Sequence, residues 1–210
     1  MFLAFACCGN QDKSPEQSEE SQTNLSAPEI DLHSAVVQDD LEAVRLHIEA
    51  GSDLNVLEST HSSTPLITAA ALGKTEAAKL LIDAGADLNI KNFDGSTALH
   101  TAAAFGKKEA AKILIDAGAD LNLQNNHGAT ALHTAAFFCR VEIVEALLEK
   151  GADKTLKNKT GQTALETVEG PFEDIKSIYD AVDASLKPLG LKLDYDLIKA
   201  TRPKIAEMLK

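Results

Sequence analysis

Apolar residues return at intervals of three and four positions through most of the chain, and this spacing predicts helices rather than strands. The stretch after Lys74 shows the spacing with four apolar residues, Ala77, Leu80, Leu81 and Ala84. Glycines follow such stretches, where a helix commonly ends in a left-handed residue: Gly73, Gly85, Gly106, Gly118 and Gly151. The pattern therefore predicts an all-α chain made of short helices arranged in pairs.

Comparison of the chain with itself shows a repeat of thirty-three residues. The segment Thr-Ala-Leu-His-Thr-Ala-Ala at 97–103 recurs unchanged at 130–136, and related segments begin at Thr64 and Thr163. A second series, Asp-Ala-Gly-Ala-Asp-Leu-Asn, begins at Asp83 and again thirty-three residues later. Two series in step at one period indicate a tandem array of structural units.

The Thr-x-Leu-His unit, the amphipathic helix after it and the Gly-Ala-Asp turn resemble the ankyrin repeat. The resemblance implies a solenoid of stacked helix-turn-helix units, each with a projecting β-turn finger. It covers residues 29–168 as four repeats and a partial fifth: 29–60, 61–92, 93–125, 126–158 and 159–168. The first repeat has Ile30 in place of the threonine and Asp39 in place of the helix-ending glycine, as is typical of a terminal capping unit.

Residues 169–210 fall outside the repeat pattern and predict two more helices. The first opens at Pro171 and carries apolar residues on one face as far as Leu186. The second runs from about Asp194 to Lys210, and we expect a bend at Pro203. We interpret this extension as a helical cap over the exposed end of the stack.

The chain has 210 residues, with 32 acidic and 20 basic side chains and a formal net charge of −12. Such a charge argues against a nucleic-acid partner, which requires a basic surface. Three cysteines provide neither a disulfide framework nor a zinc-binding spacing. We therefore expect no metal and no cofactor.

His100 and His133 are the residues that most suggest catalysis or metal binding. Both occupy the same place in the repeat, and the resemblance implies a structural hydrogen-bond network with the threonine and neighbouring backbone. Three aspartates at equivalent turns form no converging acid cluster: Asp87, Asp120 and Asp153. The sequence also lacks a nucleophile elbow and a phosphate-binding glycine loop, so we expect no enzymatic activity.

Four phenylalanines lie in the repeats, and the resemblance places Phe93 at a finger tip. It places Phe105, Phe137 and Phe138 on the last turn of a first helix, towards the concave face, where the family varies residues to select a partner. We interpret the core as Leu, Ile, Val and Ala without aromatic residues. Exposed rings are good binding anchors, so we predict a protein partner on this surface. Its polar members are Thr60, His61, Asp94, Ser96, Asn126 and His127.

Cys139 stands where the fourth repeat would have its helix-ending glycine. A β-carbon at a left-handed position is strained, and we expect a buried, unreactive thiol there. An alternative for the nearby rings is that Phe137 or Phe138 fills the gap left by this replacement.

A second hypothesis comes from a different class of function. It places a ligand-binding or catalytic site between the last repeat and the C-terminal extension. The residues that would line this site are Asp194, Tyr195, Asp196 and Arg202.

Residues 1–8 are apolar and end in Cys7 and Cys8, after which the chain turns polar. This segment resembles the end of a bacterial lipoprotein signal with Cys7 as the lipidated residue, although the basic start is missing and the apolar run is short. Residues 9–28, rich in Ser, Gln and Glu, predict a flexible acidic linker. The resemblance implies a protein held by lipid in the cell envelope and facing the periplasm, and we expect a monomer. The alternative is a cytoplasmic protein with a hydrophobic stub.

Overall fold

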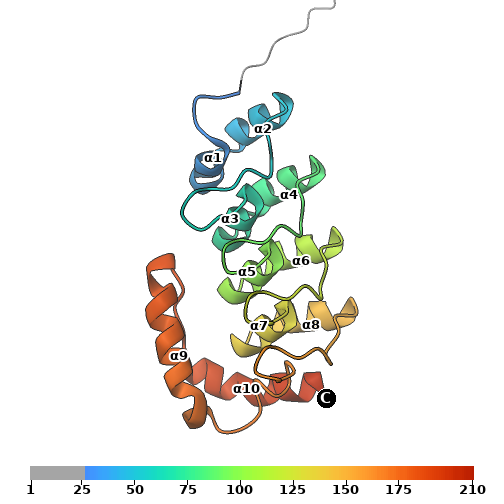
Figure 1. The fold of residues 1–210 in the computed structure, drawn as a ribbon, viewed down its shortest axis with the longest axis vertical. Helices are drawn as coiled ribbons and strands as arrows, with labels where there is room; N and C mark the ends of the chain where they lie inside the picture. The colour runs from blue at the N-terminus through green and yellow to red at the C-terminus, as the bar shows by residue number, and fades with distance from the viewer. Residues whose placement is uncertain (1–26) are drawn as a thin grey trace, which may run out of the picture.

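The computed structural model describes residues 27–210, so Cys7, the segment 1–8 and nearly all of the linker 9–28 lie outside the described residues. The repeats form four helix pairs, stacked one above another (Figure 1): α1 (Leu32–Gln38) with α2 (Leu41–Glu49), α3 (Pro65–Leu72) with α4 (Thr75–Asp83), α5 (Ala98–Phe105) with α6 (Lys108–Asp116), and α7 (Ala131–Phe137) with α8 (Val141–Glu149). The predicted all-α solenoid is confirmed. None of the helices from residue 27 onward is long and apolar enough to cross a membrane.

The first helices of the four pairs, α1, α3, α5 and α7, pack on one another along one side of the stack, and we call them the odd-numbered helices. The second helices, α2, α4, α6 and α8, pack along the other side and are called the even-numbered helices (Figure 1). Small side chains make the close approach between the odd-numbered helices possible, and the structure buries Ala69, Ala70, Ala102, Ala103, Ala135 and Ala136 completely. Larger side chains from the even-numbered helices, such as Leu81, Leu114 and Leu147, fill the space behind them. Each repeat thus buries its apolar face against its neighbours.

The first helix of each pair ends in a left-handed residue, as the sequence predicts. Gly73 and Gly106 supply it in two repeats, with φ of 72° and 65°. Asp39 and Cys139 adopt the same conformation, with φ of 62° and 55°, although both carry a β-carbon. The tight turn is therefore imposed by the stack even where the sequence lacks glycine.

The two repeated histidines form the expected network. Nδ1 of His100 lies 2.9 Å from the hydroxyl of Thr97, and its Nε2 lies 3.0 Å from the carbonyl oxygen of Ala129 in the next finger. His133 makes the same contacts with Thr130 at 2.9 Å and with the Gln162 carbonyl at 3.1 Å. Each imidazole therefore joins its own helix to the following repeat.

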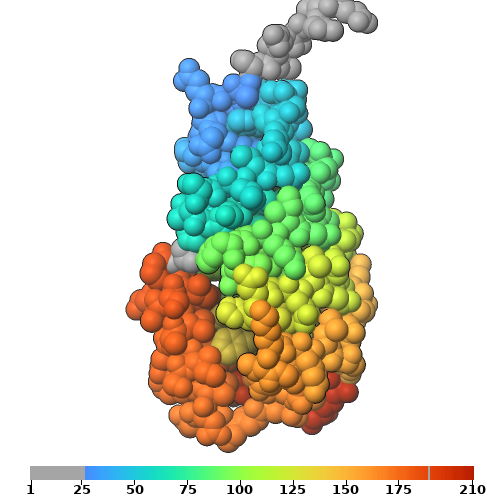
Figure 2. Space-filling view, viewed as in Figure 1, coloured from blue at the N-terminus to red at the C-terminus, as the bar shows by residue number. Residues whose placement is uncertain are grey.

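The C-terminal extension contains α9 (Phe172–Leu186), a 3-10 turn η1 (Lys187–Leu189) and α10 (Tyr195–Leu209). Helix α10 packs against α8 and covers the end of the stack, and Pro203 lies inside it without interrupting it. Helix α9 differs from the predicted cap: it rises along the side of the stack next to α7 and ends near the level of α5 (Figure 1). The space-filling view shows the C-terminal helices beside the lower repeats, while the upper repeats stay open (Figure 2).

Candidate binding surface

The loops that join one helix pair to the next, here called the fingers, lie side by side and are joined through their backbones. The N–H group of Phe93 donates to the carbonyl of His61 at 3.1 Å, and that of Asn126 donates to Asp94 at 3.0 Å. The N–H group of Lys159 donates to the carbonyl of His127 at 3.0 Å. The four finger tips therefore form one continuous hydrogen-bonded row.

Two glycines allow the tips to approach this closely. Gly95 and Gly128 both have φ of 73°. A β-carbon on Gly95 would lie 2.7 Å from the backbone nitrogen of Asn126, and one on Gly128 would lie 2.7 Å from that of Lys159. No side chain fits at either place without moving the next finger.

Phe93 lies on this row at a finger tip, and it is 63% exposed. Its ring centroid lies 5.8 Å from that of His61, and the side-chain amide of Asn126 donates to its carbonyl at 2.9 Å. Asp94 links the neighbouring fingers, with a carboxylate oxygen 3.3 Å from Nε2 of His127. The fingers thus hold a large exposed ring in a fixed polar frame.

The remaining polar members of the predicted surface belong to the same row. The hydroxyl of Ser96 donates to the carboxylate of Asp94 at 3.2 Å. Thr60 is exposed, and its N–H group donates to the Glu58 carboxylate at 2.6 Å. All six polar residues therefore lie on the fingers beside Phe93.

The expectation that Phe137 and Phe138 meet solvent is wrong. Phe138 is only 8% exposed, and Phe137 stacks on Tyr179 of α9 with the ring centroids 4.5 Å apart. The physical reason is that α9 returns beside α7, where Tyr179 covers the Phe137 ring, and the Phe137 ring in turn packs edge-on against that of Phe138. The alternative, in which Phe137 or Phe138 fills the gap left by Cys139, agrees with the structure only in that Phe138 is buried.

The expected core without aromatic residues is also wrong, since Phe172 and Tyr179 are buried. Both belong to the C-terminal extension, which the repeat pattern does not describe. Phe105, which the sequence places with the exposed rings, is half-buried at the end of α5. The signal that could have identified the aromatic contacts was the apolar face of α9, on which Tyr179 lies.

A stripe of apolar residues continues upward from Phe138 at the ends of the odd-numbered helices. Phe105 and Leu72 occupy the places that correspond to Phe138 in the two preceding repeats. Leu72 is 43% exposed, and Val37 at the end of α1 is 52% exposed. The sequence interpretation missed these two residues because, among apolar side chains, it considered only the phenylalanines.

The residues of the second hypothetical site do not converge. Asp194 caps α10 by accepting from the N–H of Leu197 at 3.0 Å, and the hydroxyl of Tyr195 donates to Asp180 at 2.9 Å. Asp196 is exposed. Of the four predicted residues, Arg202 alone lines the cavity of about 440 Å³ between the last repeat and the terminal helices.

Arg202 has a structural partner for each terminal nitrogen of its buried guanidinium. It donates to the carbonyls of Thr167 at 3.3 Å and Glu169 at 3.2 Å, and to the hydroxyl of Tyr179 at 3.4 Å. These carbonyls end the partial fifth repeat, where a second helix would otherwise continue the stack. We conclude that Arg202 attaches α10 to the last repeat, and this explains its burial.

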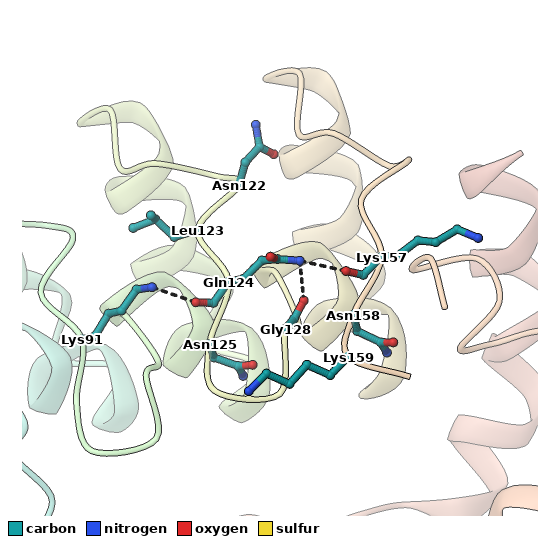
Figure 3. A pocket seen from close by; sticks show the side chains of 9 residues that line it. All are labelled: Lys91, Asn122, Leu123, Gln124, Asn125, Gly128, Lys157, Asn158 and Lys159. Atoms are coloured by element: carbon teal, nitrogen blue, oxygen red, sulfur yellow. Dashed lines mark hydrogen bonds between the residues drawn. The ribbon is translucent and has the colours of Figure 1, made fainter. Parts of the chain in front are cut away.

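A hollow of about 490 Å³ lies between the last three fingers, and the sequence interpretation did not identify it (Figure 3). We call it the lysine hollow, because Lys91, Lys157 and Lys159 line it. The ammonium of Lys91 donates to the carbonyl of Gln124 at 2.8 Å, and the amide of Gln124 donates to the carbonyls of Gly128 and Lys157 at 2.7 and 2.9 Å (Figure 3). The thirty-three-residue spacing of Lys91, Gln124 and Lys157 was the available signal.

The described residues hold no group of three His, Cys, Asp or Glu side chains placed to bind a metal ion. Asp87, Asp120 and Asp153 are separate turn residues, each accepting from the N–H two positions later at 2.8 to 2.9 Å. They therefore act within their own turns, as the sequence predicts.

Comparison with known proteins gives one family. The family model described as ankyrin repeats (three copies) matches residues 32–125 and 84–158. A search of curated proteins gives no match. The matched segments contain all four helix pairs and the finger row up to the start of its last tip.

Proposed function

Because the chain belongs to the ankyrin-repeat family, we propose that it is a non-catalytic module that binds a protein partner. Ankyrin repeats generally mediate protein–protein interaction. The partner binds the finger tips and the adjoining open face of the upper odd-numbered helices. The observation that carries this proposal is Phe93, a large ring exposed to solvent on a row of fingers that the backbone holds together.

A rigid surface favours this role. The backbone bonds between the fingers and the histidine contacts to the next repeat exist before a partner arrives, so little conformational entropy is lost on binding. Aromatic residues commonly contribute much of the binding energy at interfaces. Leu72 and Val37 add exposed apolar side chains at the ends of α3 and α1 in the open repeats. Helix α9 limits the surface at its lower end.

The test is a comparison of captured proteins. Full-length protein and its Phe93→Ala variant serve as bait in an extract of the native cell, with Ile178→Ala as the matched control. Ile178 is a large apolar residue on α9, outside the finger row, and it is exposed like Phe93. We expect specific partners to bind the parent and Ile178→Ala and to be lost with Phe93→Ala. Equal capture by all three would contradict the finger surface.

The same proposal places the module at the cell envelope as a tethered scaffold or regulator, with lipid on Cys7. It is supported by the apolar segment before Cys7 and by the acidic linker after it. Metabolic labelling with palmitate tests it. We expect label in the parent and in Cys8→Ser, and none in Cys7→Ser. Label in none of them would favour the alternative, a cytoplasmic module.

A further inference from the structure

The lysine hollow has a charge opposite to that of the whole chain. The protein carries a formal net charge of −12, yet three lysines and no acidic residue line this hollow. The other lining residues are asparagine, glutamine, leucine and glycine. On an acidic protein, an anionic group is attracted to a local positive site and repelled by the rest of the surface. On a protein that is basic throughout, it would be attracted everywhere.

No carboxylate of residues 27–210 lies within ion-pair distance of the three lysines. Among the described residues, eight other lysines form ion pairs with Asp or Glu: Lys74, Lys79, Lys108, Lys150, Lys176, Lys199, Lys204 and Lys210. Over the same part of the chain, eight lysines form none, and three of these gather in the hollow; the other five are Lys107, Lys112, Lys154, Lys187 and Lys192. The ammonium groups of Lys157 and Lys159 are therefore available to a ligand, whereas that of Lys91 donates to the Gln124 carbonyl.

The floor of the hollow is fixed by hydrogen bonds. Gln124 lies between two of the lysines and joins its finger to the next through the Lys157 carbonyl (Figure 3). Because Gly128 has no side chain, the backbone of Lys159 lies directly against the finger that contains Gly128. This contact fixes the position from which the Lys159 side chain extends. The backbone that carries the lysines is thus already ordered, so a ligand loses little conformational entropy of the protein when it binds there.

We infer that the partner segment docked on the fingers is acidic, with carboxylates placed beside Lys157 and Lys159. This inference rests on the proposed function and names the chemistry of its partner. Phe93 lies two residues after Lys91 in the same finger, so one extended peptide can reach both the ring and the hollow. Carboxylates beside lysines steer the encounter and fix the direction of the peptide.

Nucleic acid is the other polyanion that lysines attract. A nucleic-acid site needs many phosphate contacts, and the net charge of −12 opposes a long polyanion over the rest of the surface. A short acidic peptide carries fewer charges and meets only the hollow and the finger tips beside it. The observations therefore favour the peptide, and an oligonucleotide serves as a comparison in the test.

The experiment measures binding of a short fluorescent peptide in which glutamates flank one leucine. Fluorescence anisotropy with the full-length protein gives the affinity. The variant Lys157→Gln/Lys159→Gln removes the two free charges, and Lys108→Gln/Lys112→Gln removes two exposed lysines of α6 as the matched control. We expect a loss of affinity of roughly five- to tenfold in the first variant, none in the second, and weaker binding at high salt.

Three results would overturn the inference. They are the absence of peptide binding, equal binding by both variants, and tighter binding of a lysine-rich peptide or of oligothymidylate. The proposed function fails separately, when Phe93→Ala captures the same partners as the parent. If capture depends on Phe93 while the acidic peptide does not bind, the finger surface binds proteins and only the acidic partner is wrong.

Discussion

Tyr179 of α9 stacks on Phe137 of α7, with ring centroids 4.5 Å apart and ring planes inclined by 19°. Its hydroxyl donates to the carbonyl oxygen of Phe137 at 2.5 Å. Tyr179 is 0% exposed, and burial raises the pKa of its hydroxyl to about 12, so this group remains a donor. One side chain thus attaches α9 to the repeats by both a ring contact and a hydrogen bond.

Replacing Tyr179 tests this attachment. We expect Tyr179→Ala to lower the free energy of unfolding by about 3–5 kcal/mol, because it removes a fully buried ring. Tyr179→Phe keeps the ring and loses the hydrogen bonds to the Phe137 carbonyl and from Arg202, so we expect a loss of about 1–2 kcal/mol. Urea denaturation followed by circular dichroism gives both values. Equal losses in the two variants would show that the ring stack contributes little.

The repeat pattern predicts the solenoid and several local details. The phase of the two sequence series defines the helix pairs, and the turn at Cys139 is left-handed because the repeat around it forces the chain to turn there. The burial of Phe137 could not be predicted in this way, since its partner Tyr179 lies 42 residues later, outside the repeats. A repeat pattern reports neighbouring units and carries no information about a helix that returns from elsewhere.

The candidate surface likewise contains some residues that the repeat pattern predicts and others that it does not. Phe93 and the polar finger residues follow from the repeat, because their place depends only on the local turn. The lysine hollow depends on three fingers together, and its lysines become significant only when the fold gathers them around a space that no acidic residue lines. Sequence spacing alone does not distinguish Lys157 from a lysine such as Lys150, which pairs with Asp116 at 2.8 Å.

Gly128 offers a test of the contact between fingers. We expect Gly128→Ala to cost about 1–2 kcal/mol for the left-handed backbone and about 1–3 kcal/mol more for displacing Lys159. Gly161→Ala is the matched control, since its φ is also positive, at 81°, and nothing lies within 4 Å of the added carbon. Chemical denaturation of both variants separates the two costs. Equal destabilisation would mean that the fingers can separate freely.

The repeated histidines predict a dependence of stability on pH. Desolvation lowers the pKa of His100 and His133 below the ordinary 6.5. The unfolded chain therefore binds protons near pH 6.5 while the folded chain does not, so the free energy of unfolding falls as the pH drops below that value. Above it, the contribution is fully present.

Denaturation curves between about pH 8 and pH 5.5 measure this fall. The double variant His100→Asn/His133→Asn is less stable, because it loses contacts to the Ala129 and Gln162 carbonyls. We expect its stability to depend less on pH than that of the parent over the same range. An unchanged slope would show that other groups cause the loss at low pH.

The thiol of Cys139 reports on the attachment of the C-terminal helices. Burial raises its pKa to about 11, and Sγ lies 3.7 Å from the carbonyl oxygen of Ile198 in α10. Since the thiolate is the reactive form, we expect a Cys7→Ser/Cys8→Ser variant to react with a disulfide reagent only when this region opens. Adding Tyr179→Ala loosens α9 beside it and should accelerate labelling by roughly a hundredfold, whereas Phe93→Ala should not. Labelling of the folded parent at the rate of a free thiol, or equal rates in all three proteins, would show that α9 and α10 do not protect Cys139.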